Sequence, residues 1–261
     1  MITWDVFIWF ATAALSCWAA GVGALFGRFR NWAIPFVVGI LIFLAFIVGL
    51  WISLERPPMR TMGETRLWYS FFLSVVGLIV YLKWRYRWIL LFSTTLSGVF
   101  IFINLLKPEI HSKTLMPALQ SPWFVPHVIV YMFAYALLGC SLLIALYLLF
   151  AKKKKDEQSL LAAADNMVYS GFAFLTFGML FGALWAKEAW GHYWSWDPKE
   201  TWAAITWLAY LIYIHLRWHA PRYVKEACVV LIFAFLCLQM CWYGVNYLPS
   251  AQDSIHRYSA N

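Results

Sequence analysis

The chain has 261 residues, of which 63% are hydrophobic, 20% aromatic and only 12% charged. No soluble fold has enough interior to bury that much apolar surface, so the composition excludes a water-soluble globular protein and indicates a polytopic membrane protein. The net charge of +8 is explained by lysines and arginines at helix ends, which disfavours nucleic acid as a partner. The cysteines form neither a CxxC pair nor a CxxCH motif, so the sequence contains no thiol-redox, zinc or covalent haem-attachment motif.

Apolar runs of about 17–25 residues, the length that crosses a bilayer, recur along the whole chain. Backbone groups in lipid must be paired within the segment, so each run is expected to be a helix. The sequence therefore predicts an all-α polytopic bundle of about eight transmembrane helices that forms a single domain over residues 1–261. The helices are expected at residues 5–26, 33–54, 67–83, 88–106, 124–150, 166–186, 201–218 and 226–246.

The connections between these helices differ in charge. The first, third, fifth and seventh connections are short and rich in lysine and arginine, so they are expected to face the cytoplasm. An even number of helices then places both termini on the outer side, together with the loops 107–123 and 187–200 and the tail 247–261. The inner cations are Arg28, Arg30, Lys83, Arg85, Arg87, Lys152 to Lys155, Arg217, Arg222 and Lys225.

The outer loop 187–200 and the residues after it contain a dense aromatic motif. Residues 190–202 read WGHYWSWDPKETW and lie between two strongly apolar segments. A cluster of indole rings at this place favours contact with a large, flat, apolar ligand, and a porphyrin fits that description. The predicted platform for such a ligand consists of Trp190, Tyr193, Trp194, Trp196 and Trp202.

The tetrapeptide 197–200 within this motif predicts the start of a helix. Asp197 suits the N-cap, Pro198 the first helical position, and Glu200 the return contact of a capping box. Support of the ligand site by Asp197 stays open beside capping. Lys199 is either an ordinary interfacial lysine or a contact for a haem propionate.

Histidines are expected on both sides of the bilayer. His127 opens the fifth helix on the outer side and His256 lies in the outer tail, so both share the face that carries the tryptophans. Two imidazoles on opposite faces of a haem give a six-coordinate iron. His215 lies about 14 residues into the seventh helix, roughly 21 Å at ~1.5 Å per residue, so it cannot bind the same haem. Either it marks a second, inner ligand position, or it bonds to a neighbouring helix or reaches the inner interface.

The segment WGHYWSWDPKETWAAITWLAYLIYIHLR closely resembles the tryptophan-rich WWD signature of the CcsA family of cytochrome c biogenesis proteins, also called ResC. It is more distantly similar to the haem-handling proteins CcmC and CcmF. The segments LMPALQSPWFVPHV around His127 and VNYLPSAQDSIHRYSA around His256 resemble those of the family's two external histidines, and His215 in YIHLR resembles its membrane histidine. The resemblance covers roughly residues 60–261.

The resemblance implies a membrane component of a cytochrome c synthase of the System II type. Such a component binds haem b, moves it to the outer face and presents it for thioether attachment to the CxxCH cysteines of apocytochrome c. It implies that His127 and His256 are axial ligands of the outer haem and that His215 is a ligand of an inner haem. The first four predicted helices contain no histidine, so the second inner ligand is expected from a CcsB-like (ResB-like) partner subunit.

The chemistry is expected to need little acid–base machinery, so no catalytic base is assigned. Attachment is expected to occur on the complex, so whether this chain alone is an enzyme stays open. His192 departs from the family pattern and is treated as incidental. The expected location is the bacterial plasma membrane with the active face outside, or the thylakoid membrane of a plastid. Two other functions are disfavoured: a b-type electron-transfer subunit, because only His215 is embedded, and a transporter of another solute, because the spans are nearly free of charge.

Overall fold

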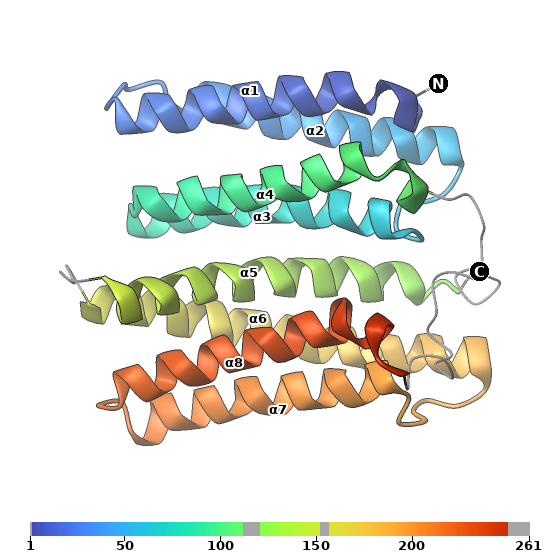
Figure 1. Ribbon diagram of the computed structural model, residues 1–261, viewed down its shortest axis with the longest axis vertical. Helices are drawn as coiled ribbons and strands as arrows, with labels where there is room; N and C mark the ends of the chain where they lie inside the picture. The colour runs from blue at the N-terminus through green and yellow to red at the C-terminus, as the bar shows by residue number, and fades with distance from the viewer. Residues whose placement is uncertain (1, 112–120, 152–156, 250–261) are drawn as a thin grey trace. The chain divides into compact units, whose positions relative to one another are not determined.

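The computed structural model describes residues 2–111, 121–151 and 157–249 (Figure 1). This part of the chain is helical along most of its length and contains no strand. The all-α fold predicted from the apolar runs is therefore confirmed. The elements are η1 (Trp4–Val6), α1 (Phe7–Phe26), α2 (Ala33–Leu54), α3 (Met62–Trp84), α4 (Arg87–Leu106), η2 (Pro108–His111), α5 (Phe124–Phe150), α6 (Glu157–Trp190), α7 (Pro198–His219), α8 (Val224–Trp242) and η4 (Gly244–Tyr247).

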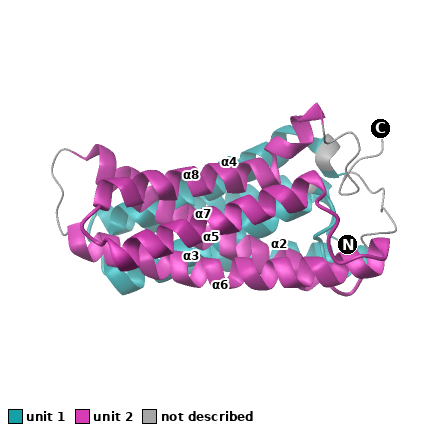
Figure 2. Ribbon diagram, turned by 90° about the horizontal axis from the view of Figure 1, so that it is seen from below, with its two compact units in different colours: residues 1–115 teal, residues 116–261 magenta. Residues whose placement is uncertain are grey.

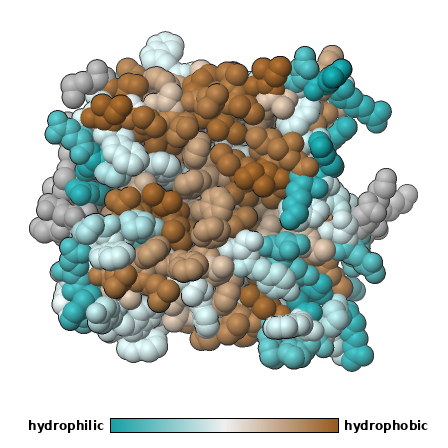
Figure 3. All heavy atoms as spheres, turned by 180° about the vertical axis from the view of Figure 1, so that it is seen from behind, coloured by the Kyte–Doolittle hydropathy of each residue, from teal (hydrophilic) through white to brown (hydrophobic). Residues whose placement is uncertain are grey.

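Among the described helices, α1 to α6 and α8 are long and apolar enough to cross a membrane. Helix α7 is long enough, with 22 residues, but its tryptophans, tyrosines, histidines and charged residues make it less apolar than the other seven. Figure 3 shows hydrophobic residues along the middle of the helices and hydrophilic residues gathered at their ends. The chain is thus a polytopic helical membrane protein. Seven of the eight predicted spans are long and apolar enough to cross a membrane. The remaining one, α7, is confirmed as a helix of sufficient length.

The chain divides into two compact units, Met1–Leu115 and Met116–Asn261, which Figure 2 shows in different colours. In the first unit α1 packs along α2 and α3 along α4, with further contacts of α1 with α4 and of α2 with α3. In the second unit α5 packs along α6 and α7 along α8, with further contacts of α5 with α8 and of α6 with α7. The single domain over residues 1–261 stays a prediction.

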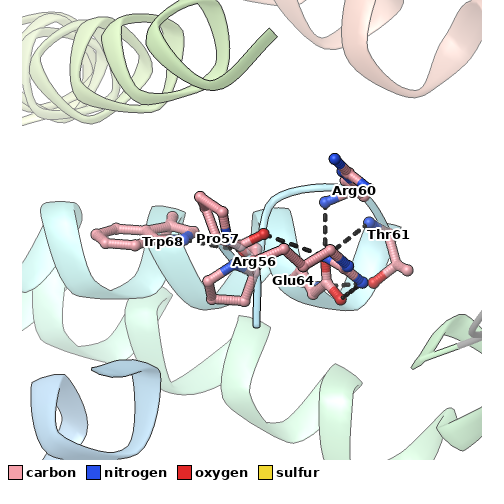
Figure 4. A network of polar contacts seen from close by, with 7 residues as sticks. Arg56, Pro57, Arg60, Thr61, Glu64 and Trp68 are labelled. Carbon is pink, nitrogen blue, oxygen red and sulfur yellow. Dashed lines mark hydrogen bonds and ion pairs between the residues drawn. The ribbon is translucent and has the colours of Figure 1, made fainter. Parts of the chain in front are cut away.

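Helix α3 begins at Met62, five residues before the predicted start at residue 67. Thr61 caps the helix, and Glu64 completes a capping box. The Glu64 carboxylate also accepts hydrogen bonds from Arg56 Nη1 and Nη2, at 3.0 and 2.8 Å, and from the Arg60 backbone N–H at 2.6 Å (Figure 4). A hydropathy pattern misses this first turn, because it is polar and a buried carboxylate stabilises it.

Helix α6 is longer than the span predicted at residues 166–186. Its 34 residues correspond to about 51 Å at ~1.5 Å per residue, against about 30 Å for the hydrocarbon core of a bilayer. The apolar run marks the part that crosses the membrane, whereas the helix continues beyond it to Trp190. Helix α8 ends at Trp242, before the predicted residue 246, and η4 follows. Gly244, which disfavours a continuing helix, explains this earlier end.

Candidate haem site in the second unit

His127 lies in the first turn of α5, and a backbone carbonyl of α6 fixes the position of its proton. Its Nδ1 is 2.8 Å from the oxygen of Gly178. A carbonyl oxygen only accepts hydrogen bonds, so Nδ1 carries the proton and donates it. In the neutral imidazole the lone pair is then on Nε2. Metal-binding histidines are commonly oriented in this way, with the other ring nitrogen donating to a carbonyl or carboxylate.

Two aromatic rings and a glycine hold the His127 ring in place. The Tyr131 ring lies edge-on with its centroid 4.6 Å away, and the Trp185 ring lies 5.4 Å away. A Cβ atom added at Gly182 of α6 would come within 2.8 Å of His127 Cε1 and 2.9 Å of Nδ1. The imidazole therefore occupies the space that a side chain at position 182 would take.

A row of aromatic rings runs from His127 to the end of α6. Trp185 is buried, and its ring centroid lies 4.9 Å from that of Phe124 and 5.0 Å from that of Trp190. Trp190 is the last residue of α6. Trp185 is not among the residues predicted from the sequence, because it precedes the tryptophan-rich motif, although it lies on the same helix one and a half turns before Trp190.

Residues 191–197, here called the Trp loop, connect α6 to α7. Gly191 (φ 86°) and Trp196 (φ 58°) have left-handed backbone conformations, which glycine adopts readily and tryptophan adopts only with strain. The Tyr193 and Trp196 side chains are 55% and 69% exposed. Trp194 is half-buried and packs edge to face against Trp196, with ring centroids 5.7 Å apart. The strained backbone thus presents large aromatic rings at the surface, as a platform for a flat ligand requires.

Asp197 and Glu200 start α7 with a capping box, as the sequence predicts. Asp197 Oδ1 accepts a hydrogen bond from the Lys199 backbone N–H at 2.9 Å. Glu200 Oε2 accepts from the backbone N–H groups of Ser195 at 2.7 Å and Asp197 at 3.2 Å. Both carboxylates are buried and directed at backbone donors. Glu200 in this way ties the Trp loop to the first turn of α7.

Replacing Glu200 by alanine is expected to loosen the Trp loop. The loss of two charge-assisted hydrogen bonds should raise the exchange rate of the Ser195 and Asp197 amide protons by about tenfold or more. Hydrogen–deuterium exchange with mass spectrometry of peptides spanning residues 191–200 measures this change. Thr201→Ala is the control, because the Thr201 hydroxyl makes one exposed bond to Trp196 O. Equal protection in Glu200→Ala and the parent chain would contradict the anchoring role of Glu200.

The end of α8 closes the site beside the start of α7. Cys241 Sγ donates to the Lys199 carbonyl at 3.5 Å, and the Trp242 ring lies 5.4 Å from that of Tyr135 in α5, between centroids. Lys199 lies ahead of the predicted span. Burial lowers the pKa of its ammonium to about 8, against the opposing influence of Cys241 and Asp197. A half-buried cation of this kind suits an acidic ligand group.

The model of the cytochrome c assembly protein family matches residues 59–251 of the chain. The chain belongs to this family. Similar proteins include the cytochrome c biogenesis protein CcsA of Trachelium caeruleum, 32% identical over 78% of this chain and 78% of the relative. CcsA of Nicotiana tomentosiformis is 33% identical over 80% of this chain and 82% of the relative. CcsA of Chlamydomonas reinhardtii is 33% identical over 91% of this chain and 72% of the relative.

These relatives confirm the CcsA resemblance that the tryptophan-rich segment predicted. The segment that matches the cytochrome c assembly family contains His127, the Trp loop and His215. It begins after α2 and ends before His256. His256 and Lys152 to Lys155, which are expected on the inner side, lie outside the described residues, so the pairing of His256 with His127 stays a prediction.

Two further predicted platform residues are Tyr193 in the Trp loop and Trp202 just after it. The centroid of the Tyr193 ring lies 5.4 Å from the Lys187 ammonium, which also donates to the Gly191 carbonyl at 2.8 Å. Trp202 is half-buried in the first turns of α7. Contact with a haem stays a prediction for each of the platform residues.

The remaining described histidines are not part of the contacts around His127. His192 is exposed in the Trp loop, and His215 is exposed towards the other end of α7, next to His219. In the first unit, His111 stacks on Trp4 with ring centroids 3.6 Å apart and an interplanar angle of 6°. This stacking gives His111 a packing role within its own unit.

Proposed function

We propose that this chain is the haem-handling membrane component of a cytochrome c synthase. It binds haem, moves it to the outer face of the membrane and presents it for covalent attachment to apocytochrome c. The environment of His127 carries this proposal, because the Gly178 carbonyl leaves Nε2 as the ligand atom. Membership of the cytochrome c assembly family and relatives named for cytochrome c biogenesis support it.

His127 is the axial ligand on one face of the outer haem, and His256 is the ligand on the other face. Haem b, bound as substrate, supplies two vinyl groups to the CxxCH cysteines. Each thioether forms when a cysteine S–H adds across a vinyl group, so that sulfur bonds to one carbon and hydrogen to the other. This addition involves no net oxidation. The task of the chain is to hold and orient the ring, and no catalytic base is assigned.

The aromatic residues around the Trp loop form the platform for this haem. Lys199 pairs with a propionate, whose negative charge offsets the cost of burying the ammonium. Asp197 supports the site by holding the start of α7, since its carboxylate is engaged with backbone N–H groups. The platform residues are Trp190, Tyr193, Trp194, Trp196 and Trp202.

His215 is the ligand of an inner haem, whose second imidazole comes from a CcsB-like membrane partner. The exposure of His215 on α7 supports this division, because a neighbouring chain can reach it. In this proposal both termini and the Trp loop lie on the outer side and residues 1–261 form one transmembrane domain, and the charge of the connections supports this orientation. The membrane is the bacterial plasma membrane, with the active face outside, or the thylakoid membrane.

The test is haem content and holocytochrome yield when the full chain is produced with its CcsB-like partner and an apocytochrome c. His127→Gly should lower both by about tenfold or more. Added imidazole should restore haem binding, which it would not do after a purely structural loss. His192→Gly is the control, because His192 is an exposed histidine close to the same site. Survival of bound haem and holocytochrome yield in a variant lacking both His127 and His256 would overturn the proposal.

A further inference from the structure

Two arginines lie in the short connection between α2 and α3 of the first unit. Residues 55–61 join these helices, and each helix is long and apolar enough to cross a membrane. Arg56 and Arg60 therefore lie close to the ends of both apolar segments, at the level where the headgroups of a bilayer begin. Ile52, in the last turn of α2, is 72% exposed, so an apolar surface directly adjoins the connection.

Contacts at several points hold this connection in one conformation. Pro57 and Pro58 restrict the backbone, since the proline ring fixes φ. The Pro58 carbonyl accepts a hydrogen bond from Trp68 Nε1 at 2.9 Å, and the Arg60 backbone N–H donates to the Glu64 carboxylate at 2.6 Å. The arginine side chains thus start from a fixed backbone, which lowers the entropic cost of ordering them around a ligand.

The Glu64 carboxylate neutralises only one of the two guanidinium groups. Arg56 engages both of its oxygens, Nη1 with Oε2 at 3.0 Å and Nη2 with Oε1 at 2.8 Å. Oε2 also accepts from the backbone N–H groups of Arg60 and Thr61. The Arg60 guanidinium points away from this carboxylate (Figure 4), and in the described part of the chain it forms no hydrogen bond or ion pair.

Arg60 therefore keeps a positive charge that its surroundings do not compensate. The residue is half-buried. Burial, and next the like charge of Arg56, lowers the pKa of its guanidinium, against the opposing effect of Glu64. An arginine stays protonated in spite of such a shift. An anion beside Arg60 would offset its repulsion from Arg56, so the position favours a negatively charged ligand.

We infer that Arg60, with Arg56 beside it, binds the phosphate group of a membrane phospholipid. A guanidinium presents parallel N–H donors that match two phosphate oxygens, and phospholipid phosphates lie at the bilayer surface, where this connection lies. The acyl chains of the same lipid contact the exposed Ile52. Inorganic phosphate has the same oxygen atoms but lacks these chains, so the lipid should bind more tightly. The inference goes beyond the proposed function, and neither arginine belongs to the proposed haem sites.

Native mass spectrometry of the detergent-solubilised full chain tests this site, with phosphatidylglycerol as the probe. We expect it to bind in preference to diacylglycerol, which has the same acyl chains without the phosphate. Arg60→Gln should weaken phosphatidylglycerol binding by about fivefold. Circular dichroism should show an unchanged fold, because Arg60 contributes to the Glu64 network through its backbone. Arg30→Gln is the matched control, since Arg30 is exposed in the connection between α1 and α2 of the same unit.

Two further measurements locate the lipid and identify its source. Phosphatidylglycerol with a photoactivatable headgroup should label residues 55–61 of the parent chain and label Arg60→Gln much less. Arg60→Lys keeps the charge but loses the planar fork, so its affinity should lie between those of Arg60→Gln and the parent. Equal binding by Arg60→Gln and the parent chain, or displacement of the lipid by inorganic phosphate at equal concentration, would overturn the inference. These measurements report bound lipid and the His127 experiment reports haem, so failure of one leaves the other standing.

Discussion

Gly182→Val is expected to abolish haem binding and holocytochrome formation without unfolding the second unit. A Cβ at position 182 would lie 2.8 and 2.9 Å from two atoms of the His127 ring, so the imidazole must move away. Its bond to the Gly178 carbonyl is then lost, so Nε2 is no longer held in the orientation that we propose for an iron ligand. We expect the haem content to fall by about tenfold or more, as for loss of groups that orient a metal ligand.

The haem absorption of purified Gly182→Val measures this effect, and circular dichroism reports the fold. Valine has a slightly higher helix propensity than glycine, so α6 itself should persist. Gly23→Val is the matched control, because an added Cβ at Gly23 in α1 meets nothing within 4 Å. Normal haem content in folded Gly182→Val would show that the His127 orientation seen here is not needed for binding.

The contact between Gly182 and His127 could not be predicted from the sequence. Apolar runs predict the helices, because lipid requires about 20 apolar residues to cross it. Local signals predict the cap at Asp197, because its partners are two and three residues away. The contact of Gly182 with His127 depends on the register of α5 against α6, which no local pattern encodes. Trp185 lies before the tryptophan-rich motif, and its contacts with Phe124 and His127 of α5 depend on the same register.

Two features were accessible to sequence reasoning but were missed. The Thr61 and Glu64 spacing is a capping-box signature that would have placed the start of α3 correctly. The four-residue spacing of His215 and His219 predicts neighbouring rings on one helix face. In both cases the helix was predicted from its apolar run alone, and the polar residues at the boundary of that run were not used.

Helix α6 links the two ends of the second unit, which explains its length beyond the bilayer. One of its ends carries Asp165, which fixes α7, and the middle carries Gly178 and Gly182, which orient His127. Its last turns carry Trp185 and lead into the Trp loop. A single helix therefore contacts the elements that carry both proposed ligand positions.

Asp165→Ala is expected to destabilise the second unit by about 3 kcal/mol, because it leaves the Arg217 guanidinium without its carboxylate in a largely buried place. The side chains of Arg217 and Asp165 are only 10% and 15% exposed. Tyr213 loses its hydrogen-bond acceptor in the same variant. Thermal unfolding of the detergent-solubilised chain, followed by circular dichroism, measures the change. Glu226→Ala, which removes an exposed carboxylate from α8, should change stability by less than about 0.5 kcal/mol.

Loss of the Asp165 contact is also expected to affect function, separately from its effect on stability. Without it, α7 is free to rotate, so the outward direction of His215 and His219 is no longer fixed. At temperatures where Asp165→Ala remains folded, occupancy of the inner haem proposed for His215 should therefore fall, whereas the Glu226→Ala control keeps it. Tyr213→Phe retains the ion pair and loses one hydrogen bond, so its stability should fall by only about 1 kcal/mol. Equal effects of Tyr213→Phe and Asp165→Ala would show that the hydroxyl, and not the ion pair, orients α7.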